Sequence, residues 1–186
     1  MTRNVKRFLA GSLLSLTPSL ALAGQVEQYP DFLSGRDEYV SLRAESAVQV
    51  PVRKGPSVES VAPALEDLLV YNQTGVDIYL GIQVLTGTLN GVYNPYPVPH
   101  ANYGGFQVSA PAPTPLIAQE YYWTVDTANP AGAKTCVWRV EVSDVGGSCS
   151  AQVFYGTYGG AVCTLDGAQS FIDPTTCYTQ IVTIMQ

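Results

Sequence analysis

Apolar and polar residues alternate along the second half of the chain with the period of two that β-strands require. The clearest run lies between residues 136 and 143. One of its faces carries Cys136, Trp138, Val140 and Val142, and the other carries Val137, Arg139 and Glu141. Successive side chains of a strand point to opposite faces, so this run predicts a strand with Cys136 and Trp138 turned into a core.

Further strand-like segments recur along the chain, separated by turn sequences rich in glycine, proline, asparagine and aspartate. They are Leu68–Asn72, Val76–Leu85, Phe106–Ala110, Glu120–Thr127, Cys149–Tyr155, Ala161–Leu165 and Cys177–Ile184, with Thr86–Val92 as an extension past Gly87. About eight short strands at roughly ten-residue spacing are typical of all-β domains. The pattern predicts an antiparallel β-sandwich or a barrel-like fold.

Three local features refine this expectation. The sequence Asn72-Gln73-Thr74-Gly75 between two strand-like segments predicts a hairpin. Ala47–Arg53 alternates, and Pro51 would confine it to a sheet edge. Ser57–Asp67 is the one fair helix candidate, with Ser60 as its cap and Pro63 in its first turn, so we expect at most one short helix.

The N-terminus has the three parts of a secretory signal peptide. Arg3, Lys6 and Arg7 precede the apolar stretch Phe8–Leu22, and Ala21-Leu22-Ala23 is a small-x-small cleavage site. The apolar stretch is too short and too broken for a good membrane span, which needs about 20 residues, and no later stretch is long and apolar enough to span a bilayer. We therefore expect residues 1–23 to be removed and the protein to be secreted or periplasmic. The form of the signal favours a bacterial source, and an N-terminal anchor helix is the alternative.

The remaining chain divides into an extended or loosely ordered segment, residues 24–56, and a β domain, residues 57–186. All four cysteines fall in the β domain, at Cys136, Cys149, Cys163 and Cys177. An even number of cysteines behind a signal peptide predicts two disulfides. No C-x2-C pair is present, which disfavours a zinc site. No metal and no cofactor is expected.

The hairpin expected through Gly146-Gly147 limits the disulfide pairing. It would hold Cys136 far along the ladder from Cys149, whereas bridged Cα atoms lie within about 7 Å. A second hairpin, turning around residues 156–159, would bring Cys149 level with Cys163. The preferred prediction is therefore Cys149–Cys163 with Cys136–Cys177, and the runner-up is Cys136–Cys163 with Cys149–Cys177.

Charge narrows the choice of partner. Three of the nine basic residues lie in the signal peptide, which leaves six against fifteen acidic residues, a formal charge of −9. Such a chain repels phosphate backbones and anionic headgroups, so nucleic-acid binding is excluded. Only 13% of residues are charged, and Thr, Ser, Gln, Asn and Tyr supply the remaining polarity.

Catalytic signatures are absent from the sequence. His100 is the only histidine, and no G-x-S-x-G, H-E-x-x-H or P-loop sequence occurs. A carboxylate pair could still hydrolyse a glycosidic bond, and Glu120, followed by Tyr121, Tyr122 and Trp123, is the most suggestive acid. Aromatic residues at such positions more often form a core, so we favour a non-enzymatic protein.

The segment from Tyr93 to Tyr103 is the candidate binding site. Its prolines lower the entropic cost of ordering, and its rings offer amphipathic contact area. The site residues expected to be partly exposed on one rim are Tyr93, Tyr96, His100 and Tyr103. The alternative is a structural crossover whose tyrosines pack back on the sheets.

These features predict a module that binds a partner or builds extracellular structure, such as a fibre or matrix subunit. The partner would be another copy of the protein, a carbohydrate or another protein. In a fibre, Gln25–Pro56 could pair with a sheet edge of a neighbour. The alternatives are a carbohydrate-binding module or glycan-active enzyme, and a secreted inhibitor or effector.

Overall fold

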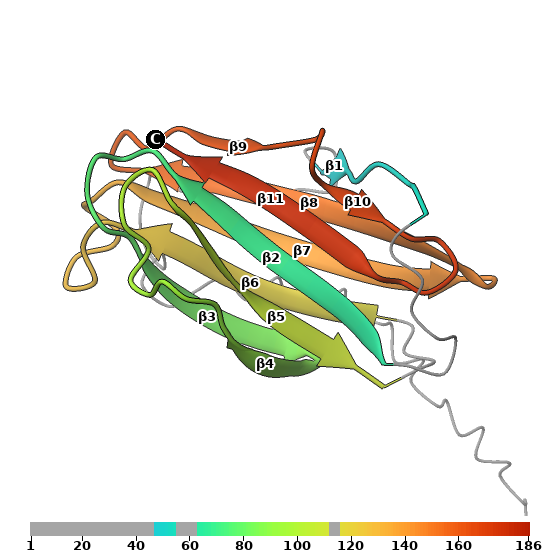
Figure 1. Cartoon of the computed structure of the whole chain (residues 1–186). Helices are drawn as coiled ribbons and strands as arrows, with labels where there is room; N and C mark the ends of the chain where they lie inside the picture. Colours follow the sequence, from blue (N-terminus) through green and yellow to red (C-terminus); the bar gives the residue numbers. More distant parts are fainter. Residues whose placement is uncertain (1–46, 55–62, 112–115) are drawn as a thin grey trace, which may run out of the picture.

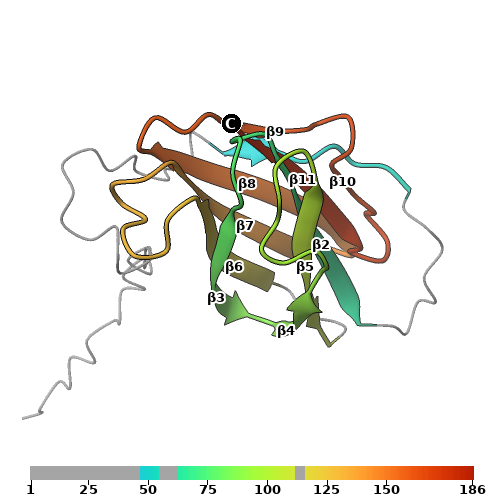
Figure 2. The same ribbon diagram turned by 60° about the vertical axis from the view of Figure 1, so that its left-hand side comes forward.

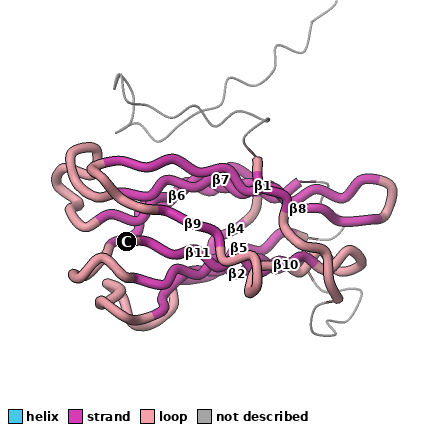
Figure 3. Tube along the Cα trace, turned by 90° about the horizontal axis from the view of Figure 1, so that it is seen from above, coloured by secondary structure: helices cyan, strands magenta, loops and turns pink. Residues whose placement is uncertain are grey.

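Two β-sheets packed face to face form the protein. The structure is a computed structural model that describes residues 47–54, 63–111 and 116–186. These ranges contain eleven strands and no helix, which confirms the all-β sandwich (Figure 1). Seen from above, the two layers lie one over the other (Figure 3). Within the same ranges, a helix with the length and hydropathy to cross a bilayer is not found.

The first sheet has five strands and is antiparallel throughout. In spatial order they are β1 (Val48–Gln49), β8 (Ser148–Tyr158), β7 (Thr135–Val145), β6 (Leu116–Thr124) and β3 (Tyr79–Thr86). Strands β7 and β8 form the long hairpin that the sequence predicts. Its turn residues Gly146 and Gly147 have φ of 67° and 82°, and two positive φ angles suit a tight two-residue hairpin turn.

The second sheet has six strands. Its spatial order is β10 (Phe171–Ile172), β11 (Thr179–Met185), β2 (Ala64–Asn72), β5 (Tyr103–Ala110) and β4 (Thr88–Val92), and β9 (Cys163–Leu165) also pairs with β11. Every pairing is antiparallel except β11 with β2, which is parallel. The C-terminal strand therefore lies beside the first long strand of the chain.

Both sides of the sandwich are crossed by the chain. On one side β1 pairs with β8, and a few residues later Val52 bridges to Ile172 of β10 in the other sheet. On the opposite side β3 and β4 are joined through Gly87, whose φ is 113°, so consecutive strands enter different sheets (Figure 2). These crossings give the sandwich its barrel-like character.

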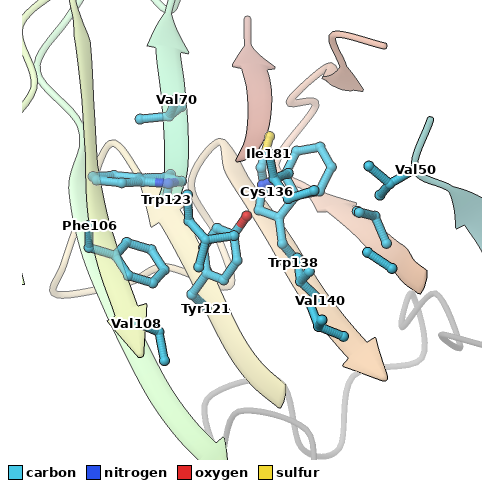
Figure 4. Close-up of a cluster of buried hydrophobic side chains, with 14 of the residues drawn as sticks. Val50, Val70, Phe106, Val108, Tyr121, Trp123, Cys136, Trp138, Val140 and Ile181 are labelled. Carbon is cyan, nitrogen blue, oxygen red and sulfur yellow. The ribbon is translucent and has the colours of Figure 1, made fainter. Parts of the chain in front are cut away.

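The core fills the space between the sheets. Its largest fully buried side chains include Trp123, Trp138, Tyr121 and Phe106 (Figure 4). The rings of Phe106 and Tyr121, from opposite sheets, meet edge to face with centroids 5.0 Å apart. Cys136 and Trp138 are both buried, which confirms their predicted inward orientation.

The disulfides are Cys136–Cys163 and Cys149–Cys177, with Cα–Cα distances of 5.7 and 5.2 Å. Cys136 lies opposite Thr157 and Cys149 opposite Asp144, so the two bridges lie at opposite ends of the β7–β8 hairpin. The exclusion of Cys136–Cys149 is confirmed, but the preferred pairing, Cys149–Cys163 with Cys136–Cys177, is wrong. The strand after β8 does not fold back onto it: β9 crosses to the other sheet and pairs with β11.

Two other local predictions are wrong. The turn at residues 72–75 does not close a hairpin, because β2 and β3 belong to different sheets. Both edges of β2 are occupied by β5 and β11, so no place beside it remains for β3. The predicted helix is also wrong over its described part, because residues 64–67 form the start of strand β2. Residues 57–62 of that prediction fall outside the described ranges.

The remaining predicted strands are present, with boundaries shifted by a few residues. The predicted edge strand at residues 47–53 corresponds to β1, at the edge of the five-stranded sheet. Strand β10 is an addition, because two residues are too short to leave an alternating pattern in a sequence.

Candidate recognition face

The outer side of the six-stranded sheet collects an unusual set of tyrosine and amide side chains. Figure 1 is viewed onto this face. Strand β2 shows how it is built, because alternate residues from Ala64 to Asn72 are buried while those between them are half-buried. The outward residues of β2 are Leu65, Asp67, Leu69 and Tyr71.

Asp67 is the centre of this face. Its carboxylate accepts hydrogen bonds from the hydroxyl of Tyr93 at 2.5 Å, from Nε2 of Gln107 at 2.8 Å and from the hydroxyl of Tyr178 at 2.7 Å. The donors come from three segments, because Gln107 faces Asp67 from β5, Tyr93 follows β4 and Tyr178 precedes β11. Both carboxylate oxygens are used, so the charge is held in place by neutral groups of fixed position.

The ring of Tyr93 crosses a whole strand to reach this carboxylate. The Tyr93 backbone N–H donates to the carbonyl oxygen of Gly105 at 2.8 Å, so the residue starts beside β5, yet its hydroxyl reaches Asp67 on β2. Burial first, and then Asp67, raise the pKa values of Tyr93 and Tyr178, so both hydroxyls stay protonated donors at neutral pH.

Beside this cluster, Tyr71 and Tyr103 form a stacked cross-strand pair. The residues lie directly opposite one another on β2 and β5, and their ring centroids are 4.6 Å apart at an interplanar angle of 30°. Tyr103 keeps 48% of its surface exposed. A ring held on one side by another ring and open to solvent elsewhere is a preordered contact surface, since aromatic side chains lose little entropy on binding.

Amide and hydroxyl groups surround the tyrosines. Nδ2 of Asn90 donates to Oε1 of Gln107 at 2.8 Å, and Oγ of Ser109 donates to Oδ1 of Asn90 at 2.8 Å. On the other side, Nε2 of Gln169 lies 3.5 Å from the hydroxyl of Tyr103. We call the set Tyr71, Tyr93, Tyr103, Gln107, Tyr178 and Asp67, with Asn90 and Gln169, the tyrosine face.

The margin of the tyrosine face carries its other charged groups. Asp166 accepts hydrogen bonds from Nε2 of Gln169 and from backbone N–H groups of its own loop, which lower its pKa. The guanidinium of Arg53 lies 4.6 Å from the ring centroid of Phe171, whose ring in turn packs against Tyr178. The centre of the face is therefore neutral apart from the enclosed Asp67.

Of the four residues predicted as a site, the structure places Tyr93 and Tyr103 on this face and the other two elsewhere. Tyr96 is 47% exposed and lies near Tyr122 of the five-stranded sheet, whose pKa it raises in addition to burial. His100 is exposed, and its Nδ1 accepts a hydrogen bond of 3.1 Å from the backbone N–H of Gly75.

The loop between Tyr93 and Tyr103 is anchored to the rest of the fold through Val98, near its middle. Val98 is fully buried, and its backbone N–H and carbonyl pair with those of Ile78 at 3.0 Å each. A Cβ on Gly104 would lie 2.1 Å from a Val98 methyl carbon, so Gly104 makes room for this side chain. The rest of the loop consists mainly of bends and turns, with cis peptide bonds before Pro95 and Pro97.

The partners of Tyr93 and Tyr103 were not identified from the sequence. Asp67 and Tyr71 share a period-two pattern with Leu65 and Leu69, which marks them as one strand face once β2 is known to begin at Ala64. The expectation of a helix ending at Asp67 and a strand beginning at Leu68 divided that pattern between two predicted elements. Tyr178 joins the face only through the parallel pairing of β11 with β2, which carries no local signal.

Glu120, the most suggestive catalytic acid in the sequence, is buried and ion-paired. Its Oε1 lies 3.0 Å from Nη1 of Arg139, and the same guanidinium binds Glu141 at 2.6 Å. A glycosidase acid must hold a proton near neutral pH, whereas a neighbouring guanidinium favours the charged carboxylate. This arrangement therefore gives no support to the glycan-active enzyme.

A second carboxyl group lies inside the sandwich. Glu66 points inward from β2 with none of its surface exposed, and burial raises its pKa to about 8. The side-chain amide of Gln119 is near enough to lower this pKa in part, although the two groups are not in hydrogen-bonding geometry. Full burial keeps this carboxyl out of reach of a ligand.

Asp144, Cys149 and Cys177 are the one group of potential metal ligands found among the described residues, with ligand atoms within 4.8 Å of one another. The two sulfur atoms are joined in a disulfide, so they are not available as thiolates.

No protein-family model, curated protein or solved structure matches this chain.

Proposed function

We propose that the protein is an exported, non-enzymatic recognition module that binds its partner on the tyrosine face. The observation that carries this proposal is the fixed arrangement of Tyr93, Tyr103 and Tyr178 around Asp67 and Tyr71. Side chains locked in place before binding cost less entropy when a partner arrives. Tyrosine with neutral amides is also the composition of adaptable binding surfaces.

Export is supported by two independent features. Both disulfides tie the β7–β8 hairpin to the C-terminal part of the chain, and such bridges persist in oxidising compartments outside the cytosol. The first 23 residues have the charge and apolar pattern of a signal peptide. Together the two features support a secreted or periplasmic location.

Assembly into a fibre by strand exchange receives less support. The described end of the segment proposed to pair with a neighbour, residues 47–54, is already engaged within its own chain. Val48 and Gln49 pair with β8, and Val52 bridges to Ile172. The rest of that segment lies outside the described residues. Partner binding on the tyrosine face is thus the better supported of the two functions.

The test compares retention of the purified mature protein on envelope and extracellular material of the producing cells. Tyr103→Ala should weaken retention about tenfold or more, the usual cost of removing an aromatic hot spot. Tyr155→Ala is the matched control, because Tyr155 is 38% exposed and also packs against one ring, that of Trp138, in the other sheet. Equal retention of the two variants, or none of the wild type, would refute the proposal.

A further inference from the structure

The exposed rings and the unused hydrogen-bonding groups of the tyrosine face indicate the class of its ligand. Of the described large hydrophobic side chains that β2, β5 and β11 place on this face, only Tyr103 is substantially exposed, while Leu65, Leu69 and Ile184 are half-buried. The core of a protein–protein interface needs several apolar anchors that become fully desolvated. A single aromatic platform among amides fits a smaller ligand with one apolar surface and many hydroxyl groups.

The amides retain hydrogen-bonding capacity for such a ligand. Among the described residues, Asn90 uses one N–H toward Gln107 and one oxygen lone pair toward Ser109, which leaves another N–H and another lone pair. Gln169 donates through Nε2, and its Oε1 has two further lone pairs. Asn90 can therefore both donate to and accept from a hydroxyl group of the ligand. Gln169, whose Nε2 already donates to Asp166 and to Tyr103, can accept a hydroxyl proton through Oε1.

Charge excludes the acidic members of this ligand class. The one central charge, Asp67, is negative and enclosed by three donors. No lysine belongs to the tyrosine face, and Arg53 at its margin is directed to Phe171 and to the carbonyl oxygens of Ala168 and Ser170. Sulfated or uronic-acid polymers and acidic peptides would therefore meet no cation cluster among the described residues of this face. Without residues 1–23 the chain also carries a formal charge of −9, which repels them.

We infer that the ligand of the tyrosine face is a neutral polysaccharide. One sugar ring stacks on Tyr103 with a hydroxyl group bonded to the amide of Gln169, and a further sugar unit bonds to the amide of Asn90, which lies beside Gln107, about 13 Å along β5 from Tyr103. This inference rests on the proposed function. The flat apolar side of a pyranose ring complements the exposed part of an aromatic ring, and a few placed polar groups fix its orientation. The stack on Tyr71 keeps Tyr103 in position.

Affinity electrophoresis of the full mature protein tests the inference. The gels contain a mixed-linkage β-glucan, a xylan, a galactomannan or an α-glucan, and polygalacturonate serves as the anionic counterpart. At least one neutral polymer should retard the wild type, and polygalacturonate should not. Tyr103→Ala should weaken that retardation about tenfold or more, whereas Tyr103→Phe and Tyr155→Ala should leave it within about twofold.

Three outcomes would overturn the inference: retardation by polygalacturonate alone, retardation by no polymer, or equal affinity of Tyr103→Ala and wild type. Periodate oxidation of the native envelope material separates this failure from failure of the proposed function. If oxidised material still retains wild type but not Tyr103→Ala, the partner is a protein, and only the glycan inference falls. If untreated material retains Tyr103→Ala and wild type equally, both the glycan inference and the proposed function are refuted.

Discussion

The hydroxyl of Tyr178 donates a hydrogen bond of 2.7 Å to Oδ2 of Asp67, although the two residues are 111 positions apart in the chain. The bond spans the boundary between β11 and β2, the parallel pair that brings the two ends of the domain together. The tyrosine face is therefore complete only when the C-terminal strand has docked. Binding on that face and folding of the whole domain are coupled through this contact.

Asp67→Asn tests the centre of the tyrosine face. An asparagine has one oxygen, so at least one tyrosine hydroxyl would meet an amide N–H instead of an acceptor. We expect the free energy of unfolding to fall by about 1 to 2 kcal/mol. Because Asp67 contributes to the raised pKa values of Tyr93 and Tyr178, both should ionise at lower pH in the variant, as followed by tyrosinate absorbance. Asp77→Asn, at an exposed site, is the control. Superimposable titrations of Asp67→Asn and wild type would contradict the assignment.

Glu66→Gln should change how stability depends on pH. The pKa of Glu66 is about 8 in the folded protein, against an ordinary value of 4.5 for a solvated glutamate, so the unfolded chain releases this proton first. The carboxyl therefore destabilises the fold progressively as pH rises from about 4.5 to about 8, and below that window its ionisation costs nothing. Between pH 5 and pH 8 this single group should lower stability by roughly 3 kcal/mol, at about 1.4 kcal/mol per pKa unit.

Urea unfolding of wild type and Glu66→Gln at pH 5 and pH 8 measures this effect. The variant should be the more stable of the two at pH 8, and the difference should shrink at pH 5. Parallel changes in the two proteins would show that Glu66 ionises normally.

Removing either disulfide should cost a similar amount of stability. The bridged residues are 27 and 28 positions apart, so the two cross-links restrict the unfolded chain almost equally. The loop-closure relation gives about 3 to 4 kcal/mol for each. Chemical unfolding of Cys136→Ala/Cys163→Ala and of Cys149→Ala/Cys177→Ala should show comparable losses. Peptide mapping without reduction checks the connectivity itself, and a peptide joining Cys149 to Cys163 would disprove it.

Gly81 should be intolerant of a side chain. A Cβ at this position would lie 2.1 Å from the ring of Tyr122, its partner on β6. Gly81→Ala must displace that ring, and we expect a loss of about 1 to 3 kcal/mol. Gly91→Ala is the matched control, because Gly91 also lies in an edge strand and nothing is found within 4 Å of its Cβ position. In a Tyr122→Ala background the cost of Gly81→Ala should largely disappear, and an unchanged cost would exclude the ring as its cause.

N-terminal sequencing of protein recovered from its native compartment tests export. The mature chain should begin at Gly24 or within a few residues of it, because signal peptidases cleave after small residues such as Ala23. Material that mostly retains Met1 would contradict export by this route.

Local pattern was sufficient to predict the strands and, in the clearest case, their inward faces. Trp138 and Cys136 were placed in the core from alternation alone, because the faces of a strand are fixed by geometry over a few residues. The tight hairpin at Gly146-Gly147 was equally local.

Strand partners could not be predicted in the same way. The turn at Asn72–Gly75 has the composition of a hairpin turn, yet it leads into the other sheet because β5 and β11 occupy both edges of β2. These pairings join distant parts of the chain and leave no periodicity in the sequence. Glu66 added a second difficulty, since a charged residue in an inward position breaks the alternation that would have marked β2.

For the same reason, only part of the tyrosine face could be predicted from the sequence. Tyr93 and Tyr103 were found because proline and tyrosine are conspicuous in a loop. Asp67 of β2 and Tyr178, the residue before β11, carry no such signal, because these two strands meet only in the folded sheet.

The two disulfides overlap along the chain, and this has a mechanical consequence. Cys149 lies between Cys136 and Cys163, and Cys163 lies between Cys149 and Cys177. The shortest covalent path from Cys136 to Cys177 therefore runs through both bridges and the 14 residue steps from Cys163 back to Cys149 (163 − 149), rather than the 41 steps between the ends (177 − 136). Under a load applied at the termini, roughly 27 residues of contour length, about 90 Å at full extension, stay locked. A pulled molecule would lengthen chiefly through the segments that precede Cys136, and its C-terminal third would resist stretching as long as the surroundings remain oxidising.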